Sequence, residues 1–312
     1  MINIKKNIHI YIITIFIVFF NLIIIIFPKE IMNSVKNGLL LWFNFVLPAL
    51  LPFMITINLL KATPFPLFLS KILSPITNKL FGLSSFGIFS LVSGMISGYP
   101  IGAKIISELY TEKKLCKNEA QYLLSFANNS GPLFIVGTVG TGLLGNKGTG
   151  YFLLLIHYMS AIIIGIIQPK QKTIITKLNN NLKFNLGKEL KSSIYNSLEA
   201  IVLVGGYIIF FSMLCTILES ILEKYNINLY IKALIYGILE ITNGCKELTQ
   251  TNRLSLSLIS GIVAFGGLSI HSQSIGYISS TDLSTIKYIL SKILQGILAF
   301  LICFFMYPLY AQ

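Results

Sequence analysis

Polar, glycine-rich motifs interrupt strongly apolar sequence at two places between Ser97 and Thr141. The motifs are SGYPIGAK at 97–104 and NNSGP at 128–132. Backbone groups released from helical hydrogen bonds are costly in hydrocarbon, so such interruptions persist at membrane depth only where they are buried in protein or line a wet cavity. Transporters build substrate sites from broken helices of this kind. The two motifs are therefore the first candidates for a functional site.

The apolar composition predicts a polytopic membrane protein with an all-α fold. Of the 312 residues, 54% are hydrophobic and only 11% are charged, with a mean hydropathy of +0.77. The net charge of +13 comes from lysines that lie mostly in predicted loops, where lysines set orientation and contact anionic headgroups. No nucleic-acid-binding motif accompanies this charge. We therefore expect membrane lipids, and no nucleic acid, as its partner.

Nothing in the sequence indicates an enzyme, a metal site or a cofactor. The motifs of hydrolases, zinc peptidases and nucleotide-binding loops are absent. The glycine-rich run 137–150 lacks the Lys-Ser/Thr pair of a phosphate-binding loop. The four cysteines are far apart, without a C-x-x-C pair and without histidines at ligand spacing. We expect a non-enzymatic protein with neither metal nor cofactor.

The chain divides into four parts. Its first apolar run, 8–27, is long enough to span a bilayer and is followed by no small-residue cleavage site. Residues 1–37 are therefore predicted to form an uncleaved N-terminal transmembrane helix and connector. Two units, 38–167 and 192–312, follow it and are joined by the basic linker 168–191.

The two units show the same order of events, which is typical of an internal repeat. Each begins with a span, continues with a short helix pair around a polar break and an interrupted helix, and ends with a span. Gly102-Ala103-Lys104 in the first unit aligns with Gly244-Cys245-Lys246 in the second. The predicted full spans are 38–60 with a kink at its prolines, 151–167, 194–218 and 286–306, and segment 61–80 is expected to lie along the interface.

Charge predicts the orientation of these units. If the N-terminus is cytoplasmic and both short pairs are re-entrant, the lysine-rich segment 61–79, the loop 113–117 and the linker 168–191 all face the cytoplasm. That arrangement satisfies the positive-inside rule. It also makes the two units inverted relative to each other, which is a known transporter architecture.

Two lysines follow the breaks and are candidates for binding an anion. Lys104 and Lys246 lie where a helix N-terminus would also offer free N–H groups. The alternative is that both lysines extend to lipid headgroups at a membrane face. From the same first motif, Ser97 and Tyr99 are further candidates for contact with a substrate.

Amides and hydroxyls mark the other candidate positions. Asn128, Asn129 and Ser130 could coordinate a substrate or a cation, or cap the half-helix that follows them. In the second half the corresponding set comprises Asn243, Ser269, His271 and Gln273. Glu240 and His271 are candidates for ion coupling, Glu240 also for pairing with Lys246, and His271 alternatively for a structural hydrogen bond.

The motifs SGYPIGAKIISELY (97–110) and LLSFANNSGPLFIVGTVG (123–140), with the weaker NGCKEL and GGLSIHSQS, carry a family resemblance. They resemble the sporulation integral membrane proteins of endospore-forming bacteria, the YlbJ family, within the nucleoside-recognition or Gate-domain group. The resemblance covers nearly the whole chain. It implies a role in spore formation and, as the activity, transport of dipicolinic acid across the outer forespore membrane.

The resemblance and the residues agree on a small organic anion. Dipicolinate is a planar aromatic dianion, which would suit Lys104, Lys246, helix N-termini, amide donors and a stacking surface such as Tyr99. We expect a transporter working by alternating access between inverted halves, with a coupling ion or other sporulation membrane proteins as further partners. The alternatives are a carrier of nucleosides or other neutral solutes with the same fold, and a non-transporting membrane scaffold for spore assembly.

Overall fold

The computed structural model describes residues 8–168, 184–222 and 224–311. These residues form helices joined by short turns and loops, and they contain no strand. This confirms the all-α prediction. The elements are α1 (Ile8–Ile26), α2 (Pro28–Leu41), the π-helical segment η2 (Trp42–Val46), α3 (Leu47–Lys61), α4 (Phe65–Leu80), α5 (Ser85–Ser97), α6 (Ile101–Thr111), α7 (Lys117–Phe126), the π-helical segment η3 (Leu133–Leu143), α8 (Lys147–Ile167), α9 (Leu186–Leu222), α10 (Leu229–Leu239), α11 (Ile241–Lys246), α12 (Arg253–Phe265), α13 (Gly267–Ile278) and α14 (Thr285–Tyr310).

Among the described residues, four segments are long and apolar enough to cross a membrane: α8, α9, α12 with α13, and α14. Two bent pairs raise the number to six if each counts as one span. These are Ile10–Ile26 with Pro28–Asn44, bent by 102°, and Leu50–Lys61 with Phe65–Leu80, bent by 92°. The polytopic character predicted from composition is therefore confirmed.

The first third of the chain differs from the prediction in one respect. The helical segment expected at 38–60 begins ten residues earlier, because Pro28 starts α2 and a proline is well suited to the first helical position, and its two parts belong to different bent pairs. Helix continues through η2 into α3, where Pro48 lies at the start and Pro52 in the interior. The wide turns of η2 directly precede these prolines, which is where helical carbonyls lose their N–H partners.

The short helix pair predicted around the first motif is present as α5 and α6. Ser84 caps α5 through the Gly87 N–H, and the buried Glu119 of α7 accepts the Ser84 N–H at 2.7 Å. A carboxylate at this position offsets the positive end of the α5 dipole. The helix ends at Gly98, whose φ of +87° is a conformation that favours glycine.

Glycines let the α5–α6 pair touch the second motif backbone to backbone. A Cβ on Gly94 would overlap the carbonyl of Ala127, and a Cβ on Gly102 would lie 2.8 Å from the Asn128 Cα. At Gly98 it would lie 2.7 Å from the Gly131 nitrogen. The glycines of both motifs therefore serve close packing between the two breaks.

The second half is more helical than predicted at one break. The sequence 240–246 was expected to be a polar interruption, but only Glu240 leaves the helical conformation and 241–246 form α11. The reason is that the Glu240 side chain accepts the Asn243 N–H and caps α11 at its start. The predicted interruption at Gly266-Gly267 is present, and both glycines have positive φ, +99° and +68°.

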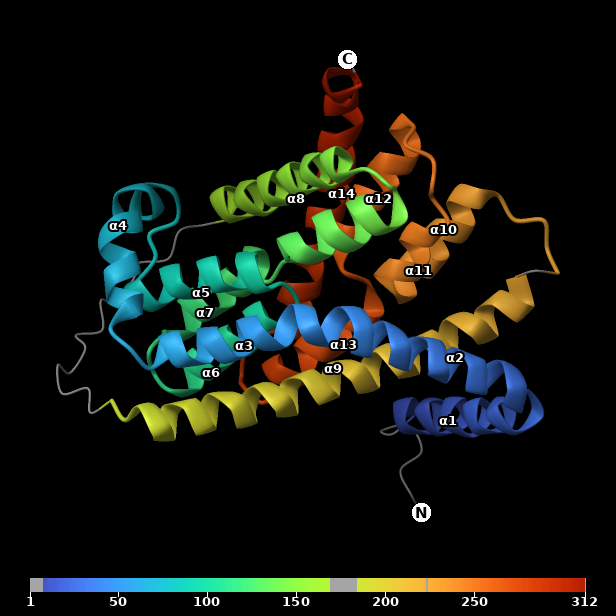
Figure 1. Ribbon diagram of the computed structural model, residues 1–312, viewed down its shortest axis with the longest axis horizontal. Helices are drawn as coiled ribbons and strands as arrows, with labels where there is room; N and C mark the ends of the chain where they lie inside the picture. Colours follow the sequence, from blue (N-terminus) through green and yellow to red (C-terminus); the bar gives the residue numbers. More distant parts are fainter. Residues whose placement is uncertain (1–7, 169–183, 223, 312) are drawn as a thin grey trace.

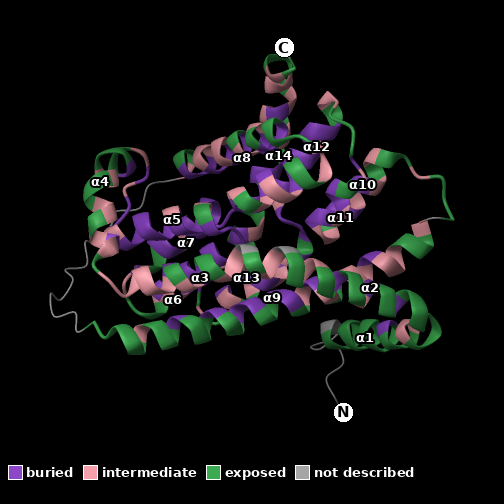
Figure 2. Cartoon of the chain, in the orientation of Figure 1, coloured by how far each residue is buried: buried purple, intermediate pink, exposed green. Residues whose placement is uncertain are grey.

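The predicted linker 168–191 lies largely outside the described residues. Its last part is helical, because α9 begins at Leu186 and runs for 37 residues. Figure 1 shows α9 along one edge of the molecule, packed beside α2 and α3. The start of α9 and α1 from Ile10 onward are mainly exposed, whereas α5, α7 and α12 are mainly buried (Figure 2).

Two hydrophobic cores cross the boundary between the predicted units. One surrounds α5, α6 and α7 and includes Ile201 of α9 and Tyr288 of α14. The other lies around α12 and α14 and includes Ile135 of η3 and Ile156 of α8. Since α8 packs against both η3 and α14, the end of the first unit is built into the second.

We predict that Gly94→Ala destabilises the protein, because the new methyl group would force α5 away from the Ala127 carbonyl. Overpacking of this kind costs about 1–3 kcal/mol. The matched control is Gly206→Ala on α9, where a Cβ meets nothing within 4 Å, so this variant should melt at or slightly above the wild-type temperature. Thermal unfolding of the purified protein in detergent measures both. Equal melting temperatures for the two variants would contradict the close contact.

We predict that the start of α9 is cytoplasmic and the start of α8 faces the opposite side. The exposed Lys188 and Lys147 report on these positions. In a background without the four native cysteines, Lys147→Cys should react with an impermeant thiol reagent added to intact cells. Lys188→Cys should react only after the membrane is opened. The reverse pattern would show that the α5–α6 pair is a full span and that the proposed orientation is wrong.

Candidate functional site

A buried lysine on α14 lies where the broken helices meet. Lys292 has no exposed surface, and its Nζ donates hydrogen bonds to three acceptors. These are the Asn128 carbonyl, Gln295 Oε1 at 2.7 Å and Asn129 Oδ1 at 3.4 Å. An ammonium has three donors, so all three have acceptors. None of those acceptors carries a charge, and in the described part of the chain no carboxylate lies within ion-pair distance of Lys292.

Asn128 connects this lysine to three helices. Its Oδ1 accepts the Ala103 N–H of α6 at 3.1 Å, and its Nδ2 donates to Ser274 Oγ of α13 at 3.0 Å and to the Tyr288 hydroxyl of α14 at 3.1 Å. Side chain and carbonyl together thus bind both halves of the chain. The second motif therefore joins α6, α13 and α14, in addition to the capping role that the sequence suggested. We call this meeting point the junction.

Asn129 completes a closed ring of hydrogen bonds with α14. Its Oδ1 accepts from Gln295 Nε2 at 3.0 Å, while Gln295 Oε1 accepts from Lys292. The Asn129 Nδ2 donates to the Phe126 carbonyl at 2.6 Å, which satisfies a carbonyl at the end of α7. Both amides are fully buried, so these bonds replace those that water would have made.

Two buried histidines flank the junction. The Ser130 N–H donates to His157 Nε2 of α8 at 3.1 Å, and His271 Nδ1 of α13 lies 3.3 Å from the Tyr288 hydroxyl. The His271 ring also packs edge-on against Phe265, with ring centres 4.6 Å apart. Lys292 follows Tyr288 by one helical turn on α14, so its ammonium lies on the helix face that His271 contacts.

An aromatic ring covers the lysine on the side of the first motif. The Tyr99 ring lies under Lys292, with Nζ 5.3 Å from the ring centre, and its hydroxyl donates to the Ala264 carbonyl at 3.1 Å. That carbonyl belongs to the last turn of α12, just before the Gly266-Gly267 break. One tyrosine thereby links the first motif to the break of the second half.

In the described part of the chain, three buried polar atoms of the junction and the first motif have no hydrogen-bond partner. They are Ser97 Oγ, His157 Nδ1 and His271 Nε2. Buried polar groups are normally satisfied, so a group without a partner calls for an explanation. Together with a lysine that has no counter-charge, these atoms form a polar centre with unused hydrogen-bonding capacity, which we call the Lys292 centre.

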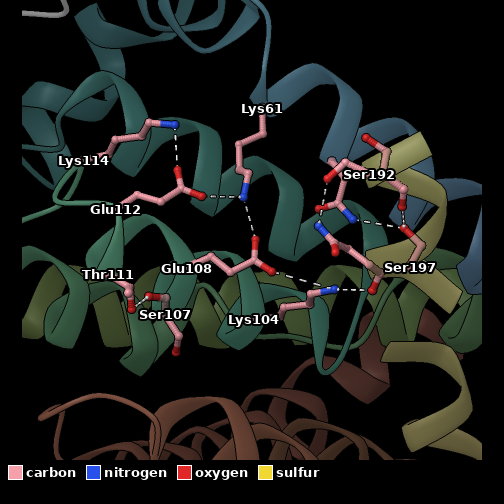
Figure 3. A network of polar contacts seen from close by, with 12 residues as sticks. Lys61, Lys104, Ser107, Glu108, Thr111, Glu112, Lys114, Ser192 and Ser197 are labelled. Atoms are coloured by element: carbon pink, nitrogen blue, oxygen red, sulfur yellow. Dashed lines mark hydrogen bonds and ion pairs between the residues drawn. The ribbon is translucent and has the colours of Figure 1, made fainter. Parts of the chain in front are cut away.

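Lys104 is not directed into this centre. It follows Ala103, whose N–H binds Asn128, but its ammonium donates to the Asn196 carbonyl of α9 at 2.7 Å and lies 3.8 Å from Glu108. Figure 3 shows the network of ion pairs and hydrogen bonds that continues from Lys104 and Glu108. Lys61 binds Glu108 at 2.7 Å and Glu112 at 3.0 Å. Lys104 therefore belongs to an ion-pair network, and it is buried rather than extended to a membrane face.

A groove runs along α9 beside this network. A cleft of about 200 Å³ lies between Lys104, Glu108 and Asn196, and a second of about 120 Å³ includes Pro100 and Gln273. Leu203 and Tyr277 line both clefts, so the two adjoin. Gln273, predicted as a substrate contact, thus lies in this groove, where it also bonds Ser269 Oγ at 3.4 Å.

The candidates around α11 lie apart from the Lys292 centre. The Glu240 carboxylate binds the Asn243 N–H at 2.9 Å and the Thr242 hydroxyl at 3.1 Å, so its partners are these groups and not Lys246. Lys246 is exposed at the last residue of α11. The structure thus places Tyr99, Asn128, Asn129, Ser130 and His271 together, with Ser97 beside them in the chain.

The sequence analysis missed the lysine itself and the groups that hold it. Lys292, Gln295, Tyr288, Ser274 and His157 were not among the candidates. A signal for the first three was present: 288, 292 and 295 recur at helical spacing within the apolar span 286–306. A lysine on such a polar stripe in a membrane helix is a functional candidate by default.

Comparison with known proteins identified a relative that is named as an integral membrane protein. No protein-family model matches the sequence, and no solved structure matches it. The chain is 29% identical over 323 aligned positions to the sporulation integral membrane protein YlbJ of Bacillus subtilis (strain 168). The alignment covers 91% of this chain and 79% of that protein, so it includes residues of both halves. With helices long and apolar enough to span a membrane, the chain is an integral membrane protein, and it is similar to YlbJ over most of its length.

Proposed function

We propose that this protein transports a small organic anion during spore formation, and that the anion is dipicolinic acid crossing the outer forespore membrane. The observation that carries the proposal is Lys292, a fully buried cation at the junction of the broken helices that has no carboxylate partner among the residues the structure describes. A charge in a membrane interior is expensive and is retained where it serves a substrate or ion pathway. The name of the Bacillus relative supports the sporulation role.

The chemistry of the centre suits a carboxylate. The three acceptors of Lys292 are neutral oxygens, and a carboxylate oxygen would form a stronger, charge-assisted bond to the same ammonium. His157 Nδ1 and His271 Nε2 of the same junction, and Ser97 Oγ of the first motif, are buried and have unused hydrogen-bonding capacity among the described residues. The Tyr99 ring offers a flat face for a planar aromatic acid. Dipicolinate combines these features in one small molecule.

Binding at Lys292 would also be coupled to movement. The lysine holds the Asn128 and Asn129 break to α14, so an anion that takes over its donors would weaken the link between the two halves. A ligand shifts a conformational equilibrium by as much as its affinity differs between the two states. Alternating access between inverted halves is the motion we propose. The recurrence of a short helix pair, an interrupted helix and a long helix in α5–α8 and α10–α14 supports it.

We predict that Lys292→Met greatly weakens dipicolinate transport. Loss of a charge-assisted hydrogen bond costs about 1.5–3 kcal/mol, which corresponds to a roughly 10- to 150-fold loss of affinity. Uptake of labelled dipicolinate into proteoliposomes measures this, with nucleosides as competing solutes. Melting temperatures verify that the variant is folded. Methionine has a similar volume, but the oxygens that accept from Lys292 lose this donor, so we also expect a lower melting temperature.

Lys104→Met is the matched control, because it removes an equally long, buried lysine that already has Glu108 as a partner. Its loss of dipicolinate affinity should be the smaller of the two. If Lys104→Met lost more affinity than Lys292→Met, the anion contact would lie in the α9 groove, as the sequence analysis expected. Transport of nucleosides with no dipicolinate transport would favour the neutral-solute carrier.

The scaffold alternative is tested by sporulation rather than by uptake. Apolar substitution of Asn128 does not test it, since Asn128 holds three helices together and its loss would disturb any function of the fold. Lys292→Met changes the charge with less disturbance of packing. If this protein only recruits spore-assembly proteins, cells producing the folded variant should accumulate dipicolinate in their spores as the wild type does. We predict spores with little dipicolinate.

A further inference from the structure

The two histidines of the Lys292 centre differ in the hydrogen-bond partner of their ring nitrogen: a backbone N–H for His157 and a hydroxyl for His271. His157 Nε2 accepts a hydrogen bond from the Ser130 backbone N–H. A backbone N–H can only donate, so Nε2 must keep its lone pair and the ring proton must be on Nδ1. A second proton on Nε2 would set two N–H groups against each other. His157 is therefore fixed as a neutral ring that presents an N–H at Nδ1, a buried atom without a protein partner.

His271 has no such restriction. Its Nδ1 faces the Tyr288 hydroxyl, which can either donate or accept. Its Nε2 is buried and has no protein partner. The ring can therefore take up a proton and keep its hydrogen bond to Tyr288, because the hydroxyl only needs to rotate. In this centre His271 is the imidazole whose charge can change.

Among the described residues, the charged group in the surroundings of His271 is Lys292. Phe265 of α12 covers the ring, Tyr288 of α14 bonds it, and Lys292 of α14 is the charged group that acts on it among the described residues. The ionisable groups on the neighbouring helices have partners elsewhere: Lys104 and Glu108 belong to the α6 network, Lys232 of α10 binds Glu247, and Arg253 of α12 binds the Phe304 carbonyl. Glu199 of α9 is exposed in the groove, and Glu119 of α7 caps α5.

Charge balance connects these histidines to the substrate. With neutral imidazoles the empty centre holds one positive charge, from Lys292. A bound dianion would change the total to one negative charge, and one added proton would bring it to zero. Uncompensated charge is costly in a buried site. An ammonium next to His271 opposes a second positive charge until an anion arrives, and a dianion favours it.

We propose that His271 takes up one proton as the dianion binds to Lys292, and that the carrier moves the proton and the dianion together. The inference rests on the proposed transport of a small dicarboxylate. The proton comes from water and adds to a ring nitrogen lone pair, and no bond of the substrate breaks. His157 contributes a fixed donor to one carboxylate through Nδ1–H. Proton coupling thus resides on α13 and substrate recognition on α8 and α14.

The experiment uses the full chain in proteoliposomes with the membrane potential held at zero. Labelled dipicolinate reports substrate flux, and a pH-sensitive dye inside the vesicles reports proton flux. For the wild type we expect addition of dipicolinate to acidify the interior by about one proton per dianion. An inward proton gradient should accelerate uptake. Substrate flux without proton flux would overturn the proposal while transport itself stands, whereas absence of any dipicolinate flux would overturn the proposed function as well.

Two variants assign the proton to its residue. His271→Gln also loses a group beside the bound anion, so exchange of labelled for unlabelled dipicolinate should be slower than in the wild type but detectable, while the proton flux should fall to the level of empty vesicles. His157→Gln, the matched control, keeps an acceptor for the Ser130 N–H and a donor for the substrate. It should lose substrate affinity less than Lys292→Met does and should retain the proton flux.

Proton flux that persists in His271→Gln would mean that the proton travels on the substrate as a monoanion, and would overturn the assignment to His271. Loss of proton flux in His157→Gln, with dipicolinate exchange retained, would overturn it as well. If His271→Gln does not fold, Tyr288→Phe offers a second test. It removes the hydroxyl that bonds the protonated ring, so the proton gradient needed for half-maximal acceleration should become steeper. An unchanged response of folded Tyr288→Phe to the gradient would contradict the proposal.

Discussion

The hydrogen bonds of one buried ammonium connect the two halves of this protein. Lys292 binds the Asn128 carbonyl and the Asn129 and Gln295 side-chain oxygens, and each of those groups is held by other polar atoms. Removing water from a lysine is costly unless hydrogen bonds and an opposite charge replace it. Here the hydrogen bonds are present, and the opposite charge is absent among the described residues. The fold therefore keeps a charge that packing alone would not require, and it keeps it where four helices converge.

Much of the architecture could be predicted because it depends on local chemistry. The apolar runs define the helices, and the glycine and proline motifs end them, as at Gly98 and Gly266. The secondary-structure predictions were wrong where a side-chain hydrogen bond determines the backbone conformation. Glu240 caps α11 and turns an expected break into helix. The start of α9 is helical although its composition is that of a polar linker.

The candidate site could be predicted only in part, because hydrogen bonds between residues far apart in sequence cannot be read from either partner alone. Asn128 and Asn129 stood out as amides in apolar sequence, and they are central. Lys104 stood out for the same kind of reason, yet its ammonium turns to Asn196 and Glu108 on the outer side of α6. Lys292, 164 positions after Asn128, gave a signal only as part of a stripe with Tyr288 and Gln295. Spacing along one helix identifies the stripe, but its partner on another helix becomes visible only in three dimensions.

The glycine contacts between the two motifs limit which parts of the molecule can move. Where backbone meets backbone, as Gly94 meets Ala127 and Gly102 meets Asn128, no side chain lies between the elements to change rotamer. The α5–α6 pair and the end of α7 must therefore travel as one rigid body. Their contacts with α13 and α14, by contrast, are made through side chains such as Asn128, Tyr99 and Lys292, which can exchange partners. If the two halves move apart, the movement takes place at these side-chain contacts with α13 and α14, and Lys292 lies among them.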